Sequence, residues 1–406
     1  MDLGLILIYA TCYFGLFTTL FFLFTLIENR KEITKGYTKK FPKVSILIPA
    51  YNEERTLYKT VSSLLRLDYP KDKLEIIVID DGSTDNTFMI AKKFVSQGVK
   101  AYTKKNEGKG KTLNFGLKRA TGTLIGCLDA DSFVSRDSLK KIIAYFDDSK
   151  VMAVTPSLKV YKPKNILQRI QMVEYLVGIF LRKMFALLGS IHVTPGPFSI
   201  YRKEFFDKYG GYDEDNLTED IEIALRILSK GYDIENSVDA SVYTVAPYNL
   251  KSLFKQRVRW YTGFAENILR YRHLFSRRYG NLGLFILPGS FFTVLLVIVS
   301  LYYFVSKLIN QGIQYFHNIN AIGFDVFGNL NLKFSTFYIS LTPAIILIIL
   351  SILTGIIVVV LAKKLSKEKT KITLSYIPYL VFYWFFFGFC WILAATLKIF
   401  KKRLIW

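Results

Sequence analysis

Four long segments without charged residues constrain the fold of this 406-residue chain more than any other feature. A helix needs about 20 predominantly apolar residues to cross the hydrocarbon layer of a membrane, and each segment is long enough. The cores of soluble proteins rarely produce four helices of this kind. The first segment has no basic region before it and no small-residue cleavage site, so we expect a retained anchor and not a signal peptide. The segments are Leu3–Ile27, Leu282–Ser306, Ser335–Ala362 and Ile372–Leu397.

The distribution of charge predicts how the chain is threaded through the membrane. The sequence contains 54 Lys and Arg residues against 32 Asp and Glu, a net charge of +22. Basic residues follow the first segment directly, from Arg30 and Lys31 onward, and lysines also fill the short loop 362–371. The loop 307–334 contains few basic residues, as expected of an outer loop. By the positive-inside rule the N-terminus is predicted outside and the middle of the chain in the cytoplasm. The basic tail at 401–403 does not fit this pattern, and its side of the membrane stays open.

These features predict a multi-pass protein of the cell (plasma) membrane with four parts. Residues 1–27 form a first transmembrane helix, 28–248 a cytoplasmic domain, 249–281 an interfacial amphipathic helix, and 282–406 three further transmembrane helices with a basic tail. A nucleic-acid binder is disfavoured, because the 43 basic residues between the first two segments are opposed by 29 acidic ones.

The middle of the chain alternates between short β-branched runs and amphipathic stretches. This alternation predicts an α/β fold, in which helices cover both faces of a parallel sheet. Ligands of such sheets bind beyond the carboxyl ends of the strands, where polar and acidic residues follow each predicted strand here. The predicted strands are Val44–Pro49, Leu74–Ile79 and Thr123–Leu128, and the predicted helices are Glu54–Leu67, Thr84–Gln97 and Lys111–Ala120.

Asp129 and Asp131, directly after the third predicted strand, give the most specific chemical signal. Two carboxylates at this spacing can share a hard divalent cation whose other ligands are phosphates and water. The same spacing occurs in ordinary turns, but its place beside Asp80 and Asp81 favours a metal site. Asp81, at the strand end, is the better ligand candidate of that pair, since the residues up to Asp85 fit a turn and a helix cap. The three histidines are far apart, so no histidine-based centre is predicted.

Two further clusters carry charge suited to chemistry. The Gly- and Lys-rich run 106–112 fails as a phosphate-binding P-loop, because Lys105 stands where that motif requires glycine. Lys109 remains a candidate for neutralising a diphosphate, with a solvated basic loop as the alternative. Glu219 and Asp220 follow Thr218, a predicted helix N-cap, but they crowd more charge than a cap needs. Burial beside other carboxylates would raise one pKa towards the working range of a general base.

A predicted amphipathic helix beginning near Leu250 places Gln256, Arg259 and Trp260 together on one flank. A helix lying on anionic lipid would explain its apolar face but not this cluster. Arg257 points into the apolar face, and the pattern gives no reason for it. Residues 166–188 predict a second surface helix.

Six motifs in this order resemble those of the membrane-integrated family 2 glycosyltransferases, which include cellulose, chitin, hyaluronan and poly-N-acetylglucosamine synthases. The resemblance extends from about Lys43 to Phe264, and the apolar segments agree with it on either side. It implies a GT-A, Rossmann-like nucleotide-binding domain and an inverting hexosyltransferase. The motifs are Pro49–Glu53, Asp80–Gly82, Asp129–Asp131, Pro195–Phe198, Thr218–Asp220 and Gln256–Trp260.

The resemblance also implies a role for each candidate residue. The nucleotide-sugar donor would be bound by Tyr51, Glu53, Asp81, Lys109 and Asp129. Mg²⁺ or Mn²⁺ would be held on its diphosphate by Asp129 and Asp131. Asp220, beside Glu219, would take the proton from the acceptor hydroxyl. The leaving diphosphate would be stabilised, and the acceptor sugar bound, by Gln256, Arg259 and Trp260.

The implied reaction transfers a sugar, from a UDP-sugar, to a growing polysaccharide or oligosaccharide, with processive synthesis coupled to export. Three C-terminal spans are few for a complete channel, so a homo-oligomer, an export partner or a short product all remain open. Two alternatives also remain open: transfer of one sugar to a lipid carrier, and a non-catalytic, membrane-anchored nucleotide-binding protein. The sugar and the linkage are not identified by the sequence.

Overall fold

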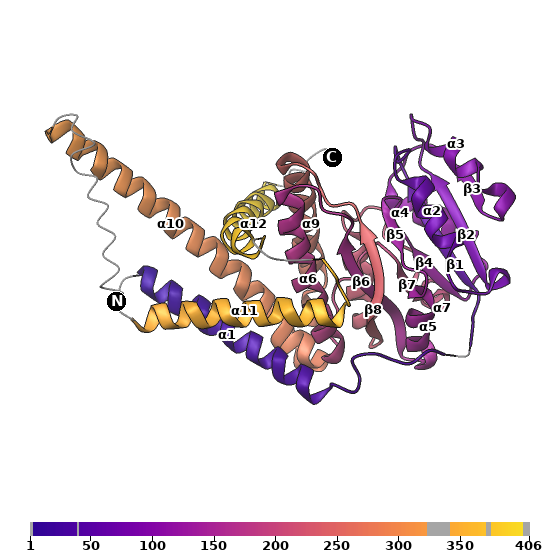
Figure 1. Ribbon diagram of the computed structural model, residues 1–406, viewed down its shortest axis with the longest axis horizontal. Coiled ribbons are helices and arrows are strands. Elements are labelled where there is room, and N and C mark those ends of the chain that lie inside the picture. The colour runs from indigo at the N-terminus through magenta and orange to yellow at the C-terminus, as the bar shows by residue number, and fades with distance from the viewer. Residues whose placement is uncertain (1–2, 39, 323–341, 371–374, 401–406) are drawn as a thin grey trace.

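The computed structural model describes residues 3–38, 40–322, 342–370 and 375–400. Figure 1 shows a sheet with flanking helices at one end of the molecule and long helices projecting from the other. Two helices, α6 (Ile166–Leu187) and α9 (Leu250–Arg270), lie between these two parts. The predicted surface helices therefore form the layer that joins the sheet to the apolar helices.

An eight-stranded mixed sheet forms the centre of the α/β part, in the order β3-β2-β1-β4-β7-β6-β8-β5. The three predicted strands are confirmed as β1, β2 and β4, which run parallel. The sheet is not parallel throughout, because the chain returns to the carboxyl end of β4 after α6, so β7 must run antiparallel to β4. The strands are β1 Val44–Ala50, β2 Leu74–Asp80, β3 Lys100–Thr103, β4 Leu124–Cys127, β5 Ser132–Val134, β6 Val151–Val160, β7 Ser199–Arg202 and β8 Asp233–Thr244.

Both faces of the sheet are buried under helices. Successive side chains of a strand point to opposite faces, so Ile46 and Ile48 of β1 enter one apolar cluster and Leu47 enters the other. The predicted helices are present, but α2 and α3 are shorter than predicted at both ends, and α4 begins and ends a few residues earlier than predicted. The helices of this part are α2 Leu57–Leu65, α3 Thr87–Lys92, α4 Lys109–Leu117, α5 Ser138–Ile143, α7 Lys203–Tyr209 and α8 Glu219–Ser229.

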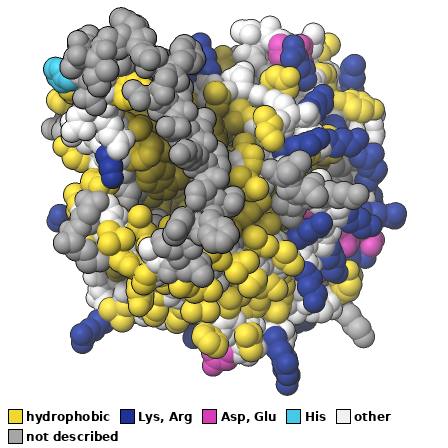
Figure 2. Space-filling view, turned by 60° about the vertical axis from the view of Figure 1, so that its left-hand side comes forward, with side chains coloured by type: hydrophobic (Ala, Val, Ile, Leu, Met, Phe, Trp, Pro, Cys, Tyr) yellow, Lys and Arg dark blue, Asp and Glu magenta, His cyan; other side chains and the backbone are white. Residues whose placement is uncertain are grey.

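Four helices in the described part of the chain are long and apolar enough to cross a membrane, which confirms the predicted multi-pass arrangement. Figure 2 shows hydrophobic side chains gathered where these helices come forward, with Lys and Arg mostly towards the sheet. Residues 335–341 and 372–374 of the predicted segments, and the basic tail at 401–403, lie outside the described residues. The helices are α1 Leu3–Glu28, α10 Leu287–Ile322 after a π-helical turn Leu282–Ile286, α11 Pro343–Leu365 and α12 Tyr376–Ile399.

Helix α10 is longer than predicted. Its 36 residues span about 54 Å, well beyond a hydrocarbon layer of about 30 Å. Residues 307–322, predicted as part of an outer loop, are helical. This stretch contains no proline and only one glycine, Gly312, so nothing in it stops the helix.

Two buried lysines attach the segments next to the membrane helices to the α/β part. The Lys159 Nζ of β6 donates to the carbonyl oxygen of Ser366, 2.6 Å away, and lies 3.5 Å from a Glu368 carboxylate oxygen. The Lys183 Nζ of α6 donates to the carbonyl oxygen of Glu32 at 3.2 Å. The chain after α1 and the chain after α11 therefore lie on the same side as the sheet.

The Lys159–Glu368 pair gives a stability prediction. Lys159 is only 3% exposed, so Glu368→Ala leaves a buried ammonium with the Ser366 carbonyl and the Tyr243 ring as neighbours but no carboxylate. We expect a loss of about 2–3 kcal/mol, because an uncompensated buried charge is costly. Thermal unfolding of the detergent-solubilised protein measures it.

The matched control is Lys369→Ala, an exposed residue of the same loop, which should leave the unfolding temperature unchanged. The double variant Lys159→Met/Glu368→Leu should recover most of the loss, since it removes both charges. Equal unfolding temperatures for Glu368→Ala and the control would show that the pair does not stabilise this attachment.

Candidate active site

The Lys109 ammonium group joins carboxylates from two separate motifs at the carboxyl edge of the sheet. Its Nζ lies 2.7 Å from Asp129 Oδ1 and 2.9 Å from Glu219 Oε1. Lys109 is the first residue of α4, Asp129 follows β4, and Glu219 begins α8. The structure thus brings together three of the residues that the sequence predicted for the site.

Gly196 makes this close arrangement sterically feasible. A Cβ atom at this position would lie 2.9 Å from Asp129 Oδ2 and 2.9 Å from Lys109 Nζ. The following Phe198 is fully buried with a positive φ of 62°, and its amide donates to the carbonyl oxygen of Cys127. The 195–198 motif therefore shapes the wall against which the Lys109–Asp129 pair lies.

Asp131 and its neighbours suit a divalent cation. Burial, followed by the charges of Asp129 and Glu53, raises the pKa of Asp131 to about 7. Its Oδ1 accepts hydrogen bonds from the hydroxyls of Ser132 at 3.0 Å and Thr244 at 3.4 Å. A cation would relieve the mutual repulsion of these carboxylates. No group of three or more His, Cys, Asp or Glu side chains placed to hold a metal ion occurs among the described residues, so substrate phosphates and water would have to complete its shell.

Asp220 lies next to Glu219 at the start of α8, where its pKa is raised to about 7. Burial is the largest cause and repulsion from Glu219 the next, while Lys109 and Arg259 act in the opposite direction. The backbone of Asp220 is fixed from another loop, since Thr194 donates from both its amide and its hydroxyl to the Asp220 carbonyl oxygen. A half-ionised carboxylate at neutral pH, held in place, is suited to accept a proton.

Asp81, which follows β2, is bonded to donors in the loop that leads into α4. Asp81 accepts hydrogen bonds from Lys104 Nζ at 2.7 Å and from the amides of Glu107 and Gly108. Burial opposes its ionisation, but these donors outweigh it and hold the pKa of Asp81 below its ordinary value. Asp81 thereby shapes the loop that leads into α4 and Lys109.

The remaining donor-site candidates, Tyr51 and Glu53, follow β1. Tyr51 is 49% exposed and open to a ligand. Glu53 accepts from the Thr56 hydroxyl at 2.5 Å, and its pKa is raised by burial and, in smaller part, by the charge of Asp129. Glu53 therefore belongs to the same electrostatic cluster as the metal candidates.

Helix α9 brings its flank residues towards the start of α8. The Arg259 Nη1 donates to the carbonyl oxygen of Leu217 at 3.4 Å. A Cβ on Gly263 would lie 2.3 Å from the Thr218 hydroxyl, so the two helices approach closely. Gln256 and Trp260, both half-buried, contact Arg257, which sequence reasoning left unexplained.

Sequence reasoning missed Thr194 and Lys104. Thr194 stands outside any charged cluster, Lys104 lies just before the Gly- and Lys-rich run, and each acts on a residue more than 20 positions away. Only the three-dimensional fold shows that they hold Asp220 and Asp81 in place.

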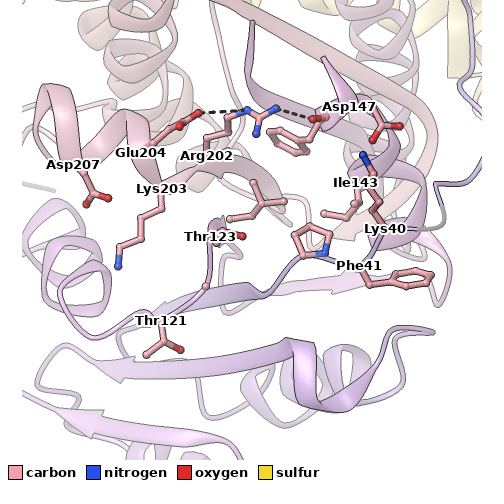
Figure 3. A pocket seen from close by; sticks show the side chains of 14 residues that line it. Lys40, Phe41, Thr121, Thr123, Ile143, Asp147, Arg202, Lys203, Glu204 and Asp207 are labelled. Carbon is pink, nitrogen blue, oxygen red and sulfur yellow. Dashed lines mark hydrogen bonds and ion pairs between the residues drawn. The ribbon is translucent and has the colours of Figure 1, made fainter. Parts of the chain in front are cut away.

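A concavity lies at the opposite edge of the sheet from these residues. It has a volume of about 750 Å³ and lies beside the amino ends of β1 and β4. Figure 3 shows Arg202 and Lys203 among the side chains that line it. Arg202 is already bonded to the carbonyl oxygens of Phe146 and Val151, and Lys203 to that of Ala120. Because the acidic strand ends lie at the other edge of the sheet, the carboxyl edge is the candidate active site.

Comparison with known families shows what this region of the chain is similar to. Residues 45–210 match the family model described as Glycosyl transferase family 2. This region of the chain is therefore similar to family 2 glycosyltransferases. The matched region includes the first four of the six motifs identified above.

The chain is similar to curated proteins from staphylococci. A poly-beta-1,6-N-acetyl-D-glucosamine synthase from Staphylococcus epidermidis is 34% identical over 247 residues, covering 60% of this chain and 59% of that protein. Its counterpart from Staphylococcus aureus (strain COL) is 35% identical over 232 residues, covering 56% of each. The matched region thus spans less than two thirds of these relatives.

The solved mannosyltransferase PcManGT from Pyrobaculum calidifontis, in complex with GDP-Man and Mn2+, has the same fold. It superimposes with a TM-score of 0.63 at 19% identity and covers 98% of this chain and 99% of its own. The predicted GT-A fold with one N-terminal and three C-terminal apolar helices is confirmed.

The Lys109 ion pairs predict a pH-dependent stability. Lys109 lowers the pKa values of Asp131 and Asp220, so Lys109→Met raises both in the folded protein. A carboxyl group whose pKa rises on folding destabilises the folded state at high pH, where its proton must be lost. We expect a loss of about 1–2 kcal/mol at pH 8 that shrinks towards pH 5, a modest figure because Lys109 is about one-third exposed. Thermal unfolding at the two pH values measures it.

Lys111→Met is the control, since Lys111 lies on the same helix, is 42% exposed and is 3.8 Å from its partner Glu107. It should show little change at either pH. A loss in Lys109→Met that is equal at pH 8 and pH 5 would contradict the electrostatic origin.

Proposed function

We propose that this protein is a membrane-bound, inverting β-glycosyltransferase that transfers N-acetylglucosamine from UDP-N-acetylglucosamine to a growing polysaccharide or oligosaccharide. The observation that carries the proposal is the Lys109–Asp129–Glu219 cluster beside Asp220 at the carboxyl edge of a family 2 domain. The sugar is suggested by the staphylococcal relatives, which are named as poly-N-acetylglucosamine synthases.

Tyr51, Glu53 and Asp81 would bind the uridine part of the donor, and Lys109 would face its diphosphate. Asp129 and Asp131 would hold Mg²⁺ or Mn²⁺; when bound, the cation supplies positive charge that neutralises the leaving diphosphate. The solved structure of PcManGT contains Mn²⁺, which supports a divalent cation at this site. The acidic cluster and Lys109 thus serve the donor side of the site.

On the acceptor side, Asp220 would accept the proton of the attacking hydroxyl. The acceptor oxygen forms a bond to the anomeric carbon, the bond from that carbon to the diphosphate breaks, and UDP leaves with the electron pair. Attack from the face opposite the leaving group inverts the configuration. Arg259 would stabilise the charge on the departing diphosphate, and Gln256 and Trp260 would bind the acceptor sugar.

We propose that residues 28–248 form the cytoplasmic catalytic domain, followed by the interfacial helix region 249–281 and by membrane helices from 282. The contacts of Lys183 with Glu32 and of Lys159 with Ser366 support this topology, since they put two predicted cytoplasmic segments beside the sheet. The N-terminus would then lie outside.

Incubation of the purified protein in lipid nanodiscs with radiolabelled UDP-N-acetylglucosamine and Mn²⁺ tests the proposal. A ladder of saccharides is expected, with little product from UDP-glucose or GDP-mannose. A product carrying one sugar on a lipid would favour the non-processive alternative. Nucleotide binding without any turnover would favour the non-catalytic one.

Asp220→Asn tests the proposed base. An amide cannot accept the proton, so we expect turnover to fall by about 10²–10⁴-fold while donor binding stays within twofold. Released UDP measures turnover, and calorimetry with UDP measures binding.

Asp213→Asn is the matched control, since Asp213 is a partly exposed carboxylate whose side chain pairs with Arg270 and not with Lys109. It should retain wild-type turnover. In the wild type, turnover should rise with pH through about 7, because the active form of Asp220 is the ionised one. Unchanged turnover in Asp220→Asn would exclude it as the base.

A further inference from the structure

Arg257 is the one residue of the 256–260 motif that the proposed mechanism does not use, apart from Val258 in the apolar core. Its side chain is fully buried, although a guanidinium always carries a charge. Burial of such a group is costly unless partners compensate it. The partners of Arg257 therefore indicate what its burial achieves.

Arg257 contacts both neighbours that the mechanism assigns to the acceptor. Its Nη1 donates to Gln256 Oε1 at 2.6 Å. Its guanidinium carbon lies 4.2 Å from the centre of the Trp260 ring, within the range of a cation–π contact. One side chain thus restricts the orientations of Gln256 and Trp260 together.

The other end of the guanidinium reaches two further helices. The Arg257 Nη2 forms a 2.6 Å ion pair with Glu174 Oε2 on α6, and the Tyr383 hydroxyl of α12 donates to the same oxygen at 2.9 Å. Stacking of Tyr261 against Trp391, with ring centres 4.4 Å apart and 7° between planes, continues the contact of α9 with α12. Arg257 is therefore fixed to an apolar helix as well as to the interfacial layer.

We propose that Arg257 is a positioning residue: with Glu174 and Tyr383 it sets Gln256 and Trp260 in the orientation that receives the acceptor sugar. This inference rests on the proposed function. In this proposal Arg257, Glu174 and Tyr383 support acceptor binding only. They take no part in binding the donor or in transferring the proton.

The geometry requires arginine and not merely a positive charge. Contacts with Gln256, Glu174 and the Trp260 ring use different edges and the flat face of one planar group. A lysine ammonium at this position is a point charge without a face to lie on the indole ring, so it cannot hold all three partners. Arg257→Lys keeps the charge and removes this geometry.

Steady-state kinetics of Arg257→Lys, Glu174→Gln and Tyr383→Phe test the proposal, with a β-1,6-linked N-acetylglucosamine tetramer as acceptor. We expect the acceptor KM to rise about tenfold in Arg257→Lys, corresponding to about 1.4 kcal/mol, and less in Tyr383→Phe. The donor KM should stay within twofold. Arg270→Lys is the control, because this arginine is on the same helix but 56% exposed and paired with Asp213.

A second readout does not depend on turnover. Acrylamide quenching of Trp260 fluorescence should increase in Arg257→Lys, because the indole ring loses its contact with the guanidinium. The Trp260 signal is obtained by subtracting the fluorescence of the Trp260→Phe variant, made both in the wild type and in Arg257→Lys. Absence of turnover in the wild-type protein would refute the proposed function. Increased quenching of Trp260 in Arg257→Lys would then still show that Arg257 positions this ring. Unchanged acceptor KM and quenching, or donor and acceptor KM rising in parallel, would overturn the inference.

Discussion

The candidate active site depends on one ammonium group placed between two carboxylates. Lys109 starts α4, while Asp129 and Glu219 come from chain segments about 90 residues apart, and the ion pairs hold these segments at one edge of the sheet. Without a cation here, Asp129, Asp131, Glu219 and Asp220 would repel one another in a poorly hydrated space. Burial, and after it the repulsion between these carboxylates, raises the pKa values of Asp131 and Asp220, and the missing side chain of Gly196 leaves room for the Lys109–Asp129 pair.

The second organising feature is the layer formed by α6 and α9. These helices face the sheet on one side and the apolar helices on the other, and their polar residues point in both directions. Arg259 reaches the loop before α8, whereas Arg257 reaches Glu174 and, through it, Tyr383. Two arginines two positions apart on one helix therefore serve the catalytic edge and the membrane part separately.

Local patterns predicted the features that depend on local physics. The strands β1, β2 and β4 were evident from β-branched runs, and the acidic residues beyond them from the rule that ligands bind at carboxyl ends. The flank of Gln256, Arg259 and Trp260 followed from helical periodicity. The antiparallel β7 and the contact of Thr194 with Asp220 could not be predicted, because both depend on where the chain returns after α6. The burial of Arg257 was visible in the pattern, but its partner Glu174 is 83 residues away, and no local rule connects them.

The Lys159 and Lys183 contacts have a consequence for how this molecule can be divided. Both side chains are almost completely covered, and part of that covering comes from Ser366 and Glu32, outside the family-matched region 45–210. A fragment cut before residue 282 would lose the segment that neutralises Lys159 and would expose the apolar faces of α6 and α9 to water. The sheet and the apolar helices therefore share buried contacts, so purification and structural work should begin with the intact chain in a lipid-like environment.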